Sequence, residues 1–116
     1  MTIVVKLTES GPYDLAPGVL MFPLFGEGAQ LNLVDLDPNA VVALHSHPHE
    51  QLGYVISGEI TMTIGGVEYP LGPEDAYEIP GGVEHGARAG GAGCRVLDVF
   101  QPVREDYRKL ADGRES

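Results

Sequence analysis

Three of the four histidines in the chain lie within the short stretch HSHPHEQ (45–51). His45 and His47 are two residues apart at the end of a strand-like run, so both side chains are expected on the same face of that strand. Gln51 closes the stretch, and the fourth histidine, His85, follows much later. Neutral imidazoles and an amide oxygen suit a divalent metal such as Zn, Ni, Fe, Mn or Cu. The predicted metal ligands are therefore His45, His47, Gln51 and His85.

The strand pattern over 41–47 must position the first two of these histidines. Val41 and Ala43 have the same parity as the histidines, so alternation places all four side chains on one face. Pro48 then interrupts the strand, because proline has no N–H to donate to a ladder. If this strand is a neighbour of the run at 51–57, the glutamine returns to the face of the histidines. A barrel could bring the fourth histidine across its interior.

Two residues next to this set, His49 and Glu50, are weaker candidates for metal ligands. A single histidine in a strand is more often hydrogen-bonded or exposed than bound to a metal, and this interpretation suits His49, which lies beyond the proline. Glu50 is the competitor for the fourth position. If the loop were one residue tighter, its carboxylate would replace the amide of Gln51, and the site would lose one unit of positive charge.

Short apolar runs bounded by Gly, Pro, Asn or Asp occupy most of the chain, a pattern typical of an all-β fold. The candidate strands are 3–7, 19–25, 30–36, 41–45, 51–57, 59–64, 67–70, 76–80, 83–87 and 95–100. Strands of this kind remove exposed edges by closing into a barrel or jelly roll, which also supplies an interior pocket.

Two dipeptides predict tight hairpin turns inside this pattern. Ser57-Gly58 separates two alternating runs, and Gly65-Gly66 offers two glycines that can both adopt positive φ. Residues 51–70 are therefore expected to form a three-stranded meander.

The tail is the one segment with a helical pattern. Residues 103–111 are predicted to form a short C-terminal helix, with Pro102 at its entry. Residues 112–116 are expected to fray. With no shift in composition along the chain, residues 1–116 are predicted to form a single domain.

Charge and composition exclude several classes of function. A formal net charge of −10 disfavours a nucleic-acid partner. The first residues, MTIVVKLTES, lack the apolar region of a signal peptide, and no run is long enough to span a membrane. These features predict a soluble, cytoplasmic protein. Cys94 is the single cysteine and opens an apolar run, so it is expected to be a buried thiol.

A second informative stretch is VLDVFQPVREDY (96–107). Alternation could place Asp98, Phe100 and Arg104 on one face, and a charge inside an apolar strand is costly unless it is paired or functional. An ion pair between Asp98 and Arg104 that pins the tail to the barrel is the structural alternative to a role in a site.

Two motifs resemble those of the cupin family. HSHPHEQLGYVISG (45–58) resembles the first cupin motif, with glutamine at its glutamate position, and PGGVEH (80–85) resembles the second. The departures are Asn39 and Glu74 where glycines are expected, and Ala89 where the second motif ends in asparagine. The resemblance implies a double-stranded β-helix, a jelly-roll barrel, over nearly the whole chain. It also implies one divalent transition metal on His45, His47, Gln51 and His85.

Together with IGG and DVFxPxREDY, these motifs resemble the small cupins of the KdgF type, which linearise 4,5-unsaturated uronates in pectin and alginate breakdown. The resemblance implies a metal-dependent, non-redox conversion to the linear 5-keto-4-deoxyuronate. In such an enzyme Asp98 would transfer a proton, Arg104 would hold the carboxylate of an anionic sugar, and Phe100 would shape the sugar wall. The alternatives are another metal-dependent cupin enzyme (a dioxygenase, lyase or cyclase) and a sugar- or metal-binding cupin without turnover.

Two further questions stay open at this level. The apolar run TIVVKL (2–7) could add a strand to the sheet of a second copy, which together with the resemblance to small cupins favours a homodimer. Tyr54, Tyr77 and Met62 could line the pocket or fill the barrel, and core packing is the default expectation for such side chains.

Overall fold

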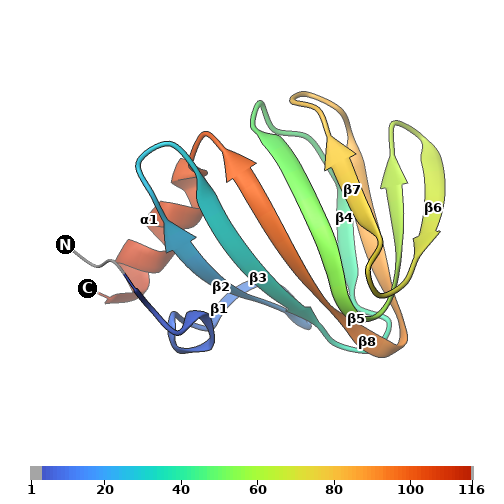
Figure 1. Cartoon of the computed structure of the whole chain (residues 1–116), viewed down its shortest axis with the longest axis horizontal. Helices are drawn as coiled ribbons and strands as arrows, with labels where there is room; N and C mark the ends of the chain where they lie inside the picture. The colour runs from blue at the N-terminus through green and yellow to red at the C-terminus, as the bar shows by residue number, and fades with distance from the viewer. Residues whose placement is uncertain (1–3, 116) are drawn as a thin grey trace.

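A computed structural model describes residues 4–115 (Figure 1). The described elements are η1 (Leu7–Glu9), β1 (Tyr13–Ala16), β2 (Val19–Phe25), β3 (Gln30–Leu36), β4 (Val41–His45), β5 (Glu50–Ile64), β6 (Val67–Leu71), β7 (Ala76–Ile79), β8 (His85–Gln101) and α1 (Glu105–Glu115). All strand pairs between these elements are antiparallel.

Two long strands, β5 and β8, pair with each other along their length and connect the two halves of the molecule (Figure 1). In one half the order is β1-β2-β3-β8-β5, with β7 on the far side of β5. In the other half β4 pairs with β8, and β6 pairs with β5. The two halves share one buried cluster, to which Val34, Val55 and Val96 contribute from the first half, and Ile60 and Met62 from the second. This arrangement is an all-β jelly roll, as predicted.

The predicted turn at Ser57-Gly58 is wrong, because the chain does not reverse there and continues as β5. Both runs pair with the same strand, β8, and the register shifts at this point instead of the chain reversing. Gly58 has φ +78, and a Cβ there would lie 2.1 Å from the carbonyl oxygen of Gly93. Gly58 and Gly93 thus allow a bulge in which the two backbones lie close together, and this bulge bends the paired strands.

Residues 85–87 of the candidate strand at 83–87 and the whole of that at 95–100 are likewise parts of one strand, β8, which passes through the glycine-rich stretch between them. Residues 83 and 84 precede this strand. The second predicted turn is confirmed. Gly65 and Gly66 have φ +58 and +83, and the residues on either side pair directly in a two-residue hairpin.

The bounds predicted for β2, β3 and β4 are confirmed. The strand predicted at 3–7 is wrong for residues 4–7, where the chain enters the turn η1, and residue 3 lies outside the described part. The sequence analysis also missed β1, which pairs with β2 at the edge of the sheet.

The C-terminal helix is confirmed but lies later than predicted, at Glu105–Glu115. Residues 112–115 continue the helix instead of fraying, and Ser116 lies outside the described residues. Two acidic residues in its first turn, Glu105 and Asp106, favour helix formation there through the helix dipole. The described residues include no helix that is both long and apolar enough to cross a membrane.

Candidate metal centre

Three histidine side chains converge at one end of the jelly roll. His45 ends β4 and pairs with His85, the first residue of β8, and their ring centroids are 4.3 Å apart. The ring of His47 lies 4.9 Å from that of His85 and 5.7 Å from that of His45. One nitrogen from each residue can be chosen so that all three lie within 4.8 Å of one another. The structure therefore brings together the three histidines predicted as ligands.

Backbone carbonyls fix the protonation of these rings. Nδ1 of His45, His47 and His85 lies 2.8, 3.1 and 2.9 Å from the carbonyl oxygens of residues 43, 49 and 83. Since a carbonyl only accepts hydrogen bonds, each Nδ1 carries the proton when its ring is neutral, and Nε2 keeps its lone pair. This is the tautomer that presents Nε2 to a metal.

Two observations show that the site fits a cation. Nε2 of His85 is buried and has no hydrogen-bond partner among the described residues. Nε2 of His47 lies 3.1 Å from Oε1 of Gln51, so two acceptors face each other once His47 donates through Nδ1. A cation between them would convert this repulsion into coordination. The three imidazoles and the amide oxygen are a donor set that divalent transition metals accept.

Burial favours the neutral form of two of these rings, those of His47 and His85. Burial lowers the pKa of His47 to about 4, with further lowering by the charges of Arg104 and His85. Burial also lowers the pKa of His85. A ligand histidine must be deprotonated to bind a metal, so these shifts favour binding at neutral pH.

A glycine-containing loop holds the position of His47. The N–H of Gly82 donates to the carbonyl of His47 at 2.8 Å. At Gly81 an added Cβ would lie 2.3 Å from the carbonyl oxygen of Pro48, so glycine is needed for this close approach. The PGG portion of the second motif thus supports the histidine loop of the first.

Strand β4 does not place Val41 on the side of the histidines, contrary to the prediction. The register of β4 shifts between Val42 and His45, so Val42 lines the pocket, whereas Val41 is 55% exposed. The assumed pairing is also wrong, because β4 pairs with β8 and not with β5. The histidines meet despite these errors because β8 carries His85 directly opposite His45.

The two weaker candidates lie outside the cluster. Glu50 is exposed, whereas Gln51 is buried and presents its oxygen to His47. His49 contacts the ring of His47 at a centroid distance of 5.3 Å, but it does not belong to the group of three.

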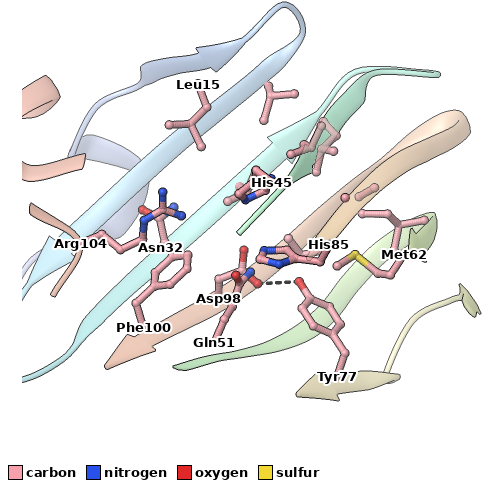
Figure 2. A pocket seen from close by; sticks show the side chains of 18 of the residues that line it. Leu15, Asn32, His45, Gln51, Met62, Tyr77, His85, Asp98, Phe100 and Arg104 are labelled. Atoms are coloured by element: carbon pink, nitrogen blue, oxygen red, sulfur yellow. Dashed lines mark hydrogen bonds between the residues drawn. The ribbon is translucent and has the colours of Figure 1, made fainter. Parts of the chain in front are cut away.

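The residues of the second stretch line the same pocket as the histidine cluster. Figure 2 shows the side chains of Asp98, Phe100 and Arg104 beside those of His45 and His85. Asp98 and Phe100 alternate on the inner face of β8, and Arg104 follows in the turn before α1. All three are at least nine-tenths buried.

Asp98 is a buried carboxyl with polar partners. Its Oδ1 accepts a hydrogen bond of 2.5 Å from the hydroxyl of Tyr77. Burial raises the pKa of Asp98 to about 6, against hydrogen bonds from Tyr77 and Gln51 and the charge of Arg104, which lower it. A carboxyl of this kind can hold or release a proton near neutral pH.

The predicted alternative of an Asp98–Arg104 ion pair is wrong. Arg104 instead binds Asp106 through Nη2 at 2.7 Å and Nε at 3.2 Å. Its guanidinium also lies 3.8 Å from the ring centroid of Tyr107 and 5.1 Å from that of Phe100. Asp106 and the aromatic rings therefore fix this cation at the pocket. Asp106 accepts from Nε and from one hydrogen of Nη2, so it does not contact the other hydrogen of Nη2 or those of Nη1.

Two of the three aromatic and methionine side chains considered above face the pocket. Tyr77 and Met62 line the pocket, whereas Tyr54 is 43% exposed. The sequence analysis did not identify Asn32, which lines the pocket and is 1% exposed. The sequence feature that could have indicated Asn32 is a polar residue within an apolar strand. Such a residue usually lies on the outer face of a sheet, so this feature alone does not predict a place in a pocket.

The chain is similar in sequence and in structure to known cupins. The model of the cupin domain matches residues 32–100. The structure of KdgF from Halomonas sp. superposes with a TM-score of 0.84 at 29% identity, covering 92% of this chain and 99% of that one.

Two curated relatives are similar over shorter segments. H2HPP isomerase of Bacillus subtilis is 36% identical over 72 residues, which are 61% of this chain and 30% of the relative. The HTH-type transcriptional regulator PuuR of Escherichia coli is 37% identical over 58 residues, 49% of this chain and 31% of the regulator. The chain thus spans about a third of the length of these relatives. Because the cupin model matches more than half of the chain, the protein belongs to the cupin family.

Proposed function

We propose that this chain is a metal-dependent enzyme that converts 4,5-unsaturated uronate monosaccharides into linear 5-keto-4-deoxyuronates. The observation that carries the proposal is that one pocket is lined both by histidines of the metal centre and by Asp98, Phe100 and Arg104. The similarity to KdgF from Halomonas sp. over nearly the whole of both chains supports it.

The proposed ligands are His45, His47, Gln51 and His85. All four are neutral, so a bound divalent metal would supply an uncompensated positive charge that polarises substrate oxygens. The donor set admits Zn, Ni, Fe or Mn alike.

The reaction moves protons without oxidation. The anomeric hydroxyl loses its proton as the bond between C1 and the ring oxygen breaks, and C4 gains a proton as the ring oxygen becomes the C5 carbonyl. Asp98 is the proposed group that exchanges a proton with the sugar, since it is buried in the pocket and its pKa of about 6 suits both directions of transfer.

Arg104 is the proposed anchor of the substrate carboxylate, and Phe100 is the proposed wall of the sugar site. The donors of Arg104 not taken by Asp106 include one hydrogen on each of Nη1 and Nη2, which suit a two-pronged carboxylate contact. The net charge of −10 opposes an anion at long range, but salt screens distant charges beyond about 8 Å.

The direct test incubates metal-loaded protein with 4,5-unsaturated galacturonate and follows the loss of ultraviolet absorbance of the double bond. Asp98→Ala and a chelated sample are the controls, and both should lose the activity. A metal-bound protein that does not accelerate the reaction over buffer excludes this substrate.

A second candidate is a cupin isomerase acting on another small molecule, which the 36% identity to H2HPP isomerase favours. A binding module without turnover is the third, since a regulator is also among the relatives. Oxygen uptake would identify a dioxygenase instead. The predicted homodimer also remains a proposal, and light scattering of the purified protein measures it directly.

A further inference from the structure

A row of register partners crosses the wall of the pocket. Asp98 on β8 and Tyr77 on β7 both pair with Gly53 on β5, the strand between them. A Cβ on Gly53 would lie 2.0 Å from Cζ of Tyr77, inside any allowed contact. The ring of Tyr77 therefore occupies the space over β5 where any other residue would place its side chain.

This placement lets the tyrosine reach across a whole strand. The hydroxyl of Tyr77 donates to Oδ1 of Asp98, as the dashed line in Figure 2 shows. Burial raises the pKa of Tyr77, so the phenol keeps its proton and remains the donor. One carboxylate oxygen is thus fixed from the β7 side of the sheet.

The side chain of Gln51 lies next to the carboxyl of Asp98 in the pocket lining, and hydrogen bonding from Gln51 lowers the pKa of Asp98. Only the amide nitrogen of Gln51 can donate, so the nitrogen faces Asp98 and the oxygen is left for the histidines. That oxygen lies 3.1 Å from Nε2 of His47. A glutamine turned the other way would present N–H groups to the metal centre and could not bind a cation there.

We infer that Tyr77 is a positioning residue, and that Gly53 leaves the space over β5 that its ring needs. The hydroxyl of Tyr77 holds the carboxyl of Asp98 against the amide of Gln51 and so turns the Gln51 oxygen toward the three histidines. The inference rests on the metal centre of the proposed function. It extends that centre by two residues that are not among its proposed ligands.

A purely packing role for Tyr77 makes a different prediction. If the ring only fills space, then Tyr77→Phe, which keeps the ring and removes the hydroxyl, leaves the metal centre unchanged. If the hydroxyl orients Asp98, the same variant weakens metal binding, and it does so only while Asp98 is present.

The test is zinc titration of the metal-free chain by calorimetry, without any sugar. Tyr77→Phe is expected to bind zinc about tenfold more weakly, at the low end of the loss caused by removing a partner that orients a ligand. In an Asp98→Ala background, Tyr77→Phe is expected to cause no further loss. Tyr54→Phe is the matched control, since it removes the same hydroxyl from an exposed tyrosine, and it should bind zinc like the wild type.

The outcomes separate the inference from the proposed function. Wild-type zinc affinity in Tyr77→Phe, or an equal loss in the Asp98→Ala background, overturns the positioning role alone. A wild-type protein that binds no zinc overturns the metal centre and this inference together. Normal zinc results without turnover of unsaturated uronates count only against the substrate. Thermal unfolding of each metal-free variant shows whether it is folded. Tyr77→Phe preserves the partly buried ring, so the test can be made even if Gly53 variants fail to fold.

Discussion

His45 and His85 face each other as direct register partners across β4 and β8, with ring centroids 4.3 Å apart. Each ring donates through Nδ1 to a carbonyl, so the two Nε2 lone pairs converge. In the metal-free state Nε2 of His85 is buried without a hydrogen-bond partner in the described chain. Such a group costs folding free energy that a bound cation would recover.

Divalent metal should therefore raise the stability of the folded protein. At 100 times the dissociation constant, zinc is expected to add about 3 kcal/mol, or roughly 10 °C in the unfolding midpoint. His85→Ala should abolish this increase, which differential scanning calorimetry measures. His49→Ala is the matched control, because this neighbour lies outside the cluster. An equal zinc response in His85→Ala would remove His85 from the site.

Arg104→Lys tests the geometry of the proposed anion contact. Lysine keeps the charge but loses the planar fork that Asp106 and the ring of Tyr107 hold in place. Steady-state kinetics should show KM for the unsaturated uronate raised about tenfold, with a smaller change in kcat. Arg108→Lys, on the adjoining helix α1 and outside the pocket lining, should behave like the wild type. A KM unchanged in Arg104→Lys would exclude the two-pronged contact.

Gly53→Ala should destabilise the protein through overlap with Tyr77. The added methyl group would lie 2.0 Å from Cζ of Tyr77, and overpacking of this kind costs about 2 kcal/mol. Urea unfolding measures this loss, and Gly91→Ala is the control, since its added Cβ meets nothing within 4 Å. In a Tyr77→Ala background the cost of Gly53→Ala should largely disappear. If the two effects simply add, the clash is with something other than the tyrosine ring.

Cys94 should react slowly with thiol reagents at neutral pH. The thiol is 7% exposed, and burial raises its pKa to about 11, with further raising by the charges of Asp98 and Asp35. Because the thiolate is the reactive form, the labelling rate should rise about tenfold per pH unit from pH 8 toward 10. The urea-unfolded protein should react much faster at pH 8. Fast, pH-independent labelling of the folded protein would contradict the buried-thiol prediction.

The sequence predicted the elements whose signals are local. The bounds of β2, β3 and β4 follow from apolar runs that the sequence shows directly. The turn at Gly65-Gly66 could also be predicted, because two adjacent glycines can both adopt the positive φ that a tight hairpin requires, as they do here.

Features that depend on strand pairing between residues distant in sequence could not be predicted from the sequence. Ser57-Gly58 has the composition of a turn, but both flanking runs find the same partner strand, and this pairing decides the path. Tyr77 meets Asp98 only because the register of three strands aligns them over Gly53. The parity of single strands gives no information on such contacts.

The motif departures at Asn39 and Glu74 can now be tested as backbone positions. Both residues have positive φ, 61 and 76, at the places where the cupin motifs usually have glycine. Asparagine tolerates this region, but for glutamate it carries a strain of about 1 to 2 kcal/mol.

Glu74→Gly should therefore stabilise the protein by about 1 kcal/mol, after the greater chain entropy of glycine in the unfolded state is subtracted. The side chain of Glu74 is exposed, and its backbone N–H bond to the carbonyl of Val55 is kept in the variant. Urea unfolding at constant pH measures the difference. Glu84→Gly, at an exposed loop position with ordinary φ, is the control and should lose stability through entropy alone. An equal loss in both variants would mean that Glu74 carries no strain, whereas a gain confined to Glu74 would show that this chain keeps the glycine conformation of the motif without the glycine.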